Sequence, residues 1–99
     1  MMRTYQRAVR ILGAKDRIKK AIEELTELSL SLQHYPNKTT LKQVVGEIAD
    51  TEGMLTQIKI VLNEETDMDI EEMIREARAE DLELLNKAIK HKTDKRRNR

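Results

Sequence analysis

The chain has 99 residues, no cysteine, a formal net charge of +1 and 38% hydrophobic residues. This length suits one domain with a modest core, so we expect oligomerisation. The absence of cysteine excludes disulfides and thiolate metal sites, and the balanced charge gives no strong field for nucleic acid. No apolar run approaches the roughly 20 residues of a transmembrane helix. We therefore expect a cytoplasmic protein that contacts neither membranes nor nucleic acid.

The apolar spacing along the first half of the chain predicts two helices. The first covers about residues 2–12 and ends at Gly13, and the second runs from about 15 to 34. Pro36 and Asn37 close the second helix and begin a turn. We therefore expect the second helix to form a hairpin with the segment that follows.

The second half of the chain predicts two further helices. The third covers about residues 40–63, and a fourth follows with a break near Glu80, where the apolar pattern shifts phase. Residues 92–99 have no apolar side chain, so we expect a disordered basic tail. The prediction is an all-α, oligomeric bundle of about four helices, with one domain over residues 1–91. The candidate N-caps of the last two helices are Thr39 or Thr40, and Thr66, Asp67 or Asp69.

Two pairs of carboxylates lie almost symmetrically about the predicted turn. Each pair has the spacing i, i+3, which puts two side chains one turn apart on one helix face. Residues equally distant from the turn lie at the same height in a hairpin, and both pairs border the apolar stripe of their helix. We therefore expect four carboxylates to converge beside the core, where they require a counter-cation: Glu24, Glu27, Glu47 and Asp50.

An all-oxygen ligand set without histidine or cysteine favours a hard cation. Mg²⁺ or Mn²⁺ suits such ligands, and magnesium sites usually combine carboxylates with phosphate oxygens and water. We therefore predict a magnesium or manganese site at these four side chains and a phosphate-bearing substrate. Glu80 and Glu83 have the same spacing but no facing counterpart, so we assign them to the surface.

The acidic motifs resemble those of the MazG-like, all-α nucleoside triphosphate pyrophosphohydrolases. That family's pattern of Glu-Glu-x-x-Glu followed by Glu-x-x-Asp matches residues 23–27 and 47–50, and the resemblance covers roughly residues 17–62. It implies a Mg²⁺-dependent hydrolase that controls the nucleotide pool, acts as a homodimer or homotetramer, and converts a nucleoside triphosphate to a monophosphate and pyrophosphate. It also suggests that Glu23 orients or deprotonates the attacking water; simple exposure of Glu23 is the alternative.

Two cations lie one and two turns upstream of Glu24 on the same helical face. Arg17 and Lys20 are therefore candidates for contacting triphosphate oxygens, although an intrahelical Lys20–Glu24 ion pair is the simpler interpretation. Glu52 falls within the apolar stripe of the third predicted helix, where a buried acid needs a partner. The alternative function is a non-enzymatic helical module whose apolar faces bind a partner protein.

Overall fold

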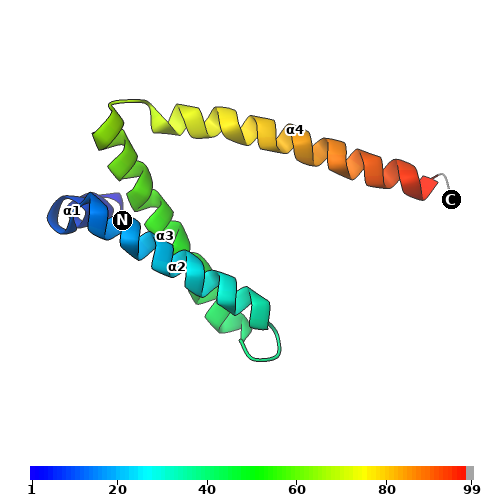
Figure 1. The fold of residues 1–99 in the computed structure, drawn as a ribbon, viewed down its shortest axis with the longest axis horizontal. Coiled ribbons are helices and arrows are strands. Elements are labelled where there is room, and N and C mark those ends of the chain that lie inside the picture. Colours follow the sequence, from blue (N-terminus) through cyan, green and yellow to red (C-terminus); the bar gives the residue numbers. More distant parts are fainter. Residues whose placement is uncertain (98–99) are drawn as a thin grey trace. The chain divides into compact units, whose positions relative to one another are not determined.

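The computed structural model describes residues 1–97 and consists of four α-helices (Figure 1). They are α1 (Met2–Leu12), α2 (Ala14–His34), α3 (Leu41–Thr66) and α4 (Ile70–Arg97). Residues 1–97 contain no strand, so the predicted all-α class is confirmed. The helices form two compact units, Met1–Met68 and Asp69–Arg99. That residues 1–91 fold as a single domain stays a prediction.

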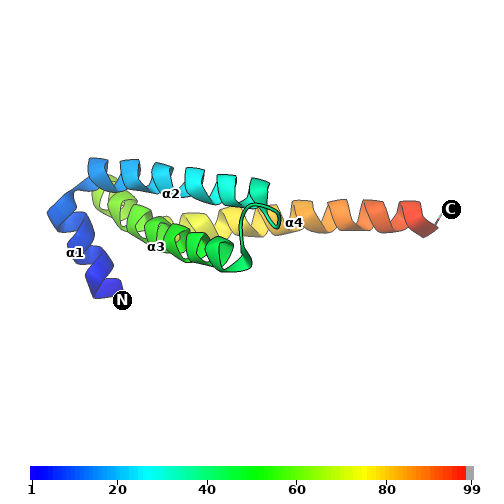
Figure 2. The same ribbon diagram turned by 90° about the horizontal axis from the view of Figure 1, so that it is seen from below.

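The second and third helices form the predicted hairpin. α2 and α3 run side by side in opposite directions, as both ribbon views show (Figures 1 and 2). Small and polar side chains account for much of what they bury: Ala21, Glu24, Val44, Thr51, Met54 and Gln57. Val61 of α3 is the most deeply buried large side chain, at 1% exposure. The hairpin therefore buries a carboxylate, Glu24, together with both apolar and polar side chains.

The apolar stripes expected to fill this seam lie largely outside it. A stripe is wider than the contact line between two helices, so a single hairpin covers only one edge of each stripe. At about 100° per residue, the uncovered edges project from the same side of an antiparallel pair. Nine large side chains, called the outer apolar face below, are 37–64% exposed: Ile18, Ile22, Leu25, Leu32, Leu41, Val45, Ile48, Leu55 and Leu62.

Side-chain caps set the ends of the last two helices. Thr40 and Gln43 form a capping box, in which the Gln43 N–H donates to Thr40 Oγ1 at 3.2 Å and the Thr40 N–H donates to Gln43 Oε1 at 2.9 Å. Asp67 ends α3 in the left-handed region, with φ of 55°. Asp69 Oδ1 accepts a hydrogen bond from the Glu72 N–H at 3.0 Å, where α4 begins. Thr40 and Asp69 are thus the predicted N-caps that the structure confirms.

The first helix joins the hairpin through one residue. Gly13 has φ of +90°, a conformation that L side chains rarely adopt. Its N–H donates to Val9 O at 2.9 Å and closes α1. α1 packs on both α2 and α3, and Val9 is buried at 3% exposure.

The fourth helix is longer and more regular than predicted. α4 runs without interruption from Ile70 to Arg97, so the break expected near Glu80 is wrong. Residues 92–97 continue the helix instead of forming a disordered tail, because lysine and arginine are good helix formers. Residues 98 and 99 of the predicted tail lie outside the described residues. Across residues 1–97, no helix combines the length and the hydropathy needed to cross a membrane.

Candidate metal centre

Three of the four predicted metal ligands converge between α2 and α3. One carboxylate oxygen from each of Glu24, Glu27 and Glu47 lies within 4.8 Å of the other two. Glu24 is buried, Glu47 is partly buried and Glu27 is exposed. The cluster is therefore anchored in the hairpin seam by Glu24 and open to solvent at Glu27, so that an ion and its waters have access.

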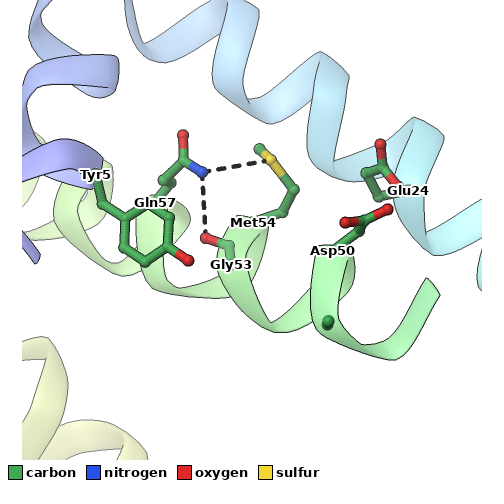
Figure 3. A pocket seen from close by; sticks show the side chains of 7 residues that line it. Tyr5, Glu24, Asp50, Gly53, Met54 and Gln57 are labelled. Carbon is green, nitrogen blue, oxygen red and sulfur yellow. Dashed lines mark hydrogen bonds between the residues drawn. The ribbon is translucent and has the colours of Figure 1, made fainter. Parts of the chain in front are cut away.

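The fourth predicted ligand lies beside this group. Asp50 follows Glu47 by one turn of α3, and its charge raises the pKa of Glu47. In the close-up, the carboxylate of Asp50 points toward that of Glu24 across the seam (Figure 3). The two facing acidic pairs predicted from the sequence are thus brought together, with Asp50 at the edge of the cluster.

The electrostatics of the cluster favour a bound cation. Burial raises the pKa of Glu47 above its ordinary value, and the charges of Glu27 and Glu24 raise it further. Glu24 Oε2 and Glu47 Oε2 are both buried and have no hydrogen-bond partner. A buried carboxylate oxygen without a partner is costly. A divalent cation is a ligand that would satisfy both oxygens and remove the repulsion at once.

Lys20 compensates part of this negative charge from within α2. Its Nζ lies 3.2 Å from Glu24 Oε1 and 3.8 Å from Glu23 Oε2. The hydrogen bond and the charge of Glu24 raise the pKa of Lys20. The intrahelical Lys20–Glu24 pair is therefore present, and it leaves the second oxygen of Glu24 without a partner. That Lys20 contacts phosphate, and that Glu23 acts on a water, stay predictions.

A pocket of about 300 Å³ adjoins Glu24 and Asp50 (Figure 3). Tyr5 from α1 and Gln57 from α3 line it further along the hairpin, together with Ala49, Gly53 and Met54. Gln57 was not among the residues that the sequence predicted for the site. The spacing of seven residues between Asp50 and Gln57 could have placed them on one face of α3, but no sequence signal placed α1 beside them.

Arg17 contacts one of the residues that line this pocket, Gln57. Its Nη1 donates to Gln57 Oε1 at 3.2 Å, and its Nε donates to Asp16 Oδ1 at 2.9 Å. The Arg17 side chain is only 14% exposed. Its guanidinium therefore holds Gln57 in place, while contact with a phosphate stays a prediction.

Three acids outside the cluster, Glu52, Glu80 and Glu83, are all exposed. Glu52 is exposed, so the expectation that it lies in a buried stripe is wrong; the buried edge of α3 passes through Thr51 and Met54 instead. Glu83 lies 3.6 Å from Lys87 Nζ, with both side chains at least 70% exposed. Glu80 is exposed as well, so the assignment of the Glu80/Glu83 pair to the surface is confirmed.

Comparison with known proteins corrects the predicted family. No curated protein and no solved structure matches the chain. The family described as the Tau95 triple barrel domain matches residues 1–98. The assignment to the MazG-like enzymes is therefore wrong, and the predicted hydrolysis of nucleoside triphosphates is wrong with it. Acids spaced i, i+3 are common on helices, so the motif occurred here without that relationship.

The name of the matching family and the helical fold of this chain differ. The family description names a barrel, whereas residues 1–97 of this chain form four helices and no strand. Membership rests on the match along almost the whole sequence, and the geometry of the carboxylate cluster rests on the helical hairpin. The chain belongs to the Tau95 triple barrel domain family.

Proposed function

We propose that the chain is a non-enzymatic helical interaction module, related through its family to a transcription factor, that binds a partner protein on the outer apolar face. One observation carries the proposal: nine large apolar side chains on one hairpin are 37–64% exposed. Contiguous exposed apolar surface is uncommon on monomeric soluble proteins and marks interaction sites. An amphipathic helix of a partner, with apolar residues at spacings of three and four, suits such a surface.

A shallow pocket gives this face an anchor point. It has a volume of about 420 Å³ and lies along α2, lined by Ile22, Leu25 and Leu30. Thr26, Ser29 and Gln33 also line it, and the Gln33 side-chain amide donates to Ser29 Oγ at 3.1 Å. An apolar centre with a polar rim is the usual anatomy of a protein interface. A large side chain of the partner would fit into this pocket.

The carboxylate cluster has a structural role in this proposal. Glu24, Glu27, Glu47 and Asp50 would hold Mg²⁺ or Mn²⁺ and tie α2 to α3. The two buried oxygens without partners, Glu24 Oε2 and Glu47 Oε2, support this assignment. A cation bound only by the folded hairpin raises its stability, by about 2.7 kcal/mol at a concentration 100 times the Kd. The predicted enzyme and the predicted cytoplasmic location are not part of this proposal.

Site-specific photo-crosslinking tests the interaction proposal. We would place a photoreactive amino acid at Leu25, on the outer apolar face, and at Glu64, an exposed position at the end of α3. We expect one discrete crosslinked partner from position 25 and none from position 64. The substitution Ile48→Asp on the same face should abolish the crosslink while leaving the helical circular dichroism unchanged. A crosslink that survives Ile48→Asp would contradict the proposal.

A further inference from the structure

The fourth helix carries opposite charges on its two halves. Residues 70–83 contain six acidic and two basic side chains, a net charge of −4. Residues 84–96 contain five basic side chains and one acidic side chain, a net charge of +4 with His91 neutral. Favourable interaction with the helix dipole explains such a bias only within the first and last turns. Glu80, Asp81 and Glu83 lie in the middle of α4, so the dipole does not account for them.

Most of these charges have no ion-pair partner among the side chains that the structure describes. Glu83 pairs with Lys87, and Glu72 pairs with Arg75. The unpaired side chains of α4 include three acids and three lysines: Glu76, Glu80, Asp81, Lys90, Lys92 and Lys95. They are all exposed. Within residues 70–96, α4 therefore has an acidic half and a basic half of equal and opposite net charge.

The same helix also carries an apolar series, which is exposed except at the partly buried Ile74. Ile74, Ala77, Leu84 and Ala88 follow the alternating spacing of three and four residues, with Asp81 completing the series. Leu84 is 64% exposed, and Leu85 beside it is 56% exposed. This spacing is the pattern by which one helix packs along another, and a single polar residue in the series fixes the register at some cost in stability. α4 thus has the pattern of a helix that pairs with another helix.

We propose that α4 pairs antiparallel with the α4 of a second copy of the chain. In this arrangement the acidic half of each helix lies along the basic half of the other, and a two-fold axis passes near the middle of α4. A parallel pair would instead oppose −4 to −4 and +4 to +4. The charge pattern therefore selects both the occupant, an identical helix, and its direction. The pairing uses neither the outer apolar face nor the carboxylate cluster, so it is independent of the proposed function.

Charge-reversal variants of the full chain test the pairing. A basic variant, Glu76→Lys with Glu80→Lys and Asp81→Lys, changes the acidic half from −4 to +2. An acidic variant, Lys90→Glu with Lys92→Glu and Lys95→Glu, changes the basic half from +4 to −2. Both leave the Glu83–Lys87 pair intact. Light scattering should report twice 11.6 kDa for the wild type and 11.6 kDa for each variant alone, with the dimer Kd raised at least about tenfold.

Mixing experiments then separate pairing from a general loss of structure. The basic and acidic variants should form a dimer with each other when mixed, because their α4 helices have opposite charge along the whole length. A variant that fails to fold would not recover in this way. An unchanged dimer in either variant alone would overturn the proposal. A wild-type monomer would also overturn it, because α4 would then be covered within the chain or by another partner such as nucleic acid.

A variant with all six substitutions tests the direction. Its charge order along α4 is reversed, so it should dimerise with itself as the wild type does. In an antiparallel pair with the wild type, its basic half would meet a basic half and its acidic half an acidic half. The six-substitution variant should therefore not exchange subunits with the wild type, measured by fluorescence energy transfer between labels on single introduced cysteines, since the chain has none. Free exchange would show a parallel pair and overturn the proposal.

Discussion

A Cβ atom at Gly53 would lie 2.9 Å from the hydroxyl oxygen of Tyr5, so the close approach of α1 to α3 depends on a glycine at this position. Gly46 is also within α3, but a Cβ atom there would have no neighbour within 4 Å. The two glycines of α3 therefore differ in what a methyl group would contact. Both lack a side chain that would favour the helix.

Alanine at the two glycines should have different effects on the free energy of unfolding. Gly46→Ala should raise it by about 0.5–1 kcal/mol, the usual gain for alanine over glycine within a helix. Gly53→Ala should not raise the free energy of unfolding in this way, because its methyl group displaces Tyr5. Combining it with Tyr5→Phe should restore the gain, since the nearest ring atom would then be 3.5 Å away. Denaturant unfolding measures all four proteins, and equal gains at both glycines in the wild type would contradict the argument.

Neutralising the carboxylate cluster should remove cation binding without unfolding the hairpin. Glu24→Gln and Glu47→Gln should each lower the affinity for Mg²⁺ or Mn²⁺ by at least about tenfold, since each removes an anionic ligand. Without metal, their melting temperatures should equal or exceed that of the wild type, because repulsion is relieved. Titration calorimetry and circular dichroism make the two measurements. Glu83→Gln, on the surface of α4, is the control, and wild-type affinity in Glu47→Gln would remove that residue from the site.

The stability of the hairpin should depend on pH in opposite directions without and with metal. Because its pKa is raised in the folded chain, Glu47 binds a proton more tightly folded than unfolded. Its favourable contribution is fully present below the ordinary pKa of a glutamate and is lost as pH rises through the raised value. The metal-free chain should therefore melt at a higher temperature at pH 5 than at pH 7.

Saturating Mg²⁺ should reverse this trend, because the metal binds the deprotonated carboxylates. Glu47→Gln should weaken the pH dependence of the metal-free chain. Thermal melts at the two pH values, in chelator and in excess Mg²⁺, provide the comparison. A metal-free chain that is less stable at pH 5 than at pH 7 would disagree with the raised pKa of Glu47.

Two ion-paired arginines should differ in their importance for stability. Arg17→Ala removes a donor from Gln57 Oε1, and Gln57 is 6% exposed, so we expect a loss of about 1–3 kcal/mol from the unmet hydrogen bond. Arg75→Ala breaks only an exposed pair with Glu72 and should change stability by about 0.5 kcal/mol or less. Denaturant unfolding distinguishes them. Similar losses for the two variants would mean that Gln57 finds another partner.

The sequence predicted the first three helices and the facing acids, but it did not predict which apolar side chains are exposed. Thr40 and Gly13 mark helix ends through local chemistry. Residues spaced symmetrically about one turn, such as Glu24 and Glu47, lie at the same height in any antiparallel hairpin. Helical amphipathicity identifies which residues are apolar but not which edge of a stripe meets its neighbour. Leu25 and Ile48 therefore fit the apolar pattern of their helices, although they lie on the outer apolar face.

The residues that line the pocket and the length of α4 could not be predicted from local apolar patterns. Tyr5 reaches the pocket through the packing of α1 on α3, a contact between residues almost fifty positions apart. The length of α4 was underestimated because a polar segment without apolar residues can be helical when its residues favour the helix.

Gly13 has a consequence for the size of the pocket beside the cluster. α1 is attached to α2 through this one residue, and Tyr5 lies eight residues away along a rigid helix. Eight residues of helix span about 12 Å, so a rotation of about 10° at Gly13 moves Tyr5 by about 2 Å. The φ and ψ angles of Gly13 thus determine how far Tyr5 lies from the rest of the pocket lining. Replacing Gly13 would change the gap between Tyr5 and Gln57 without altering a single residue of the pocket lining.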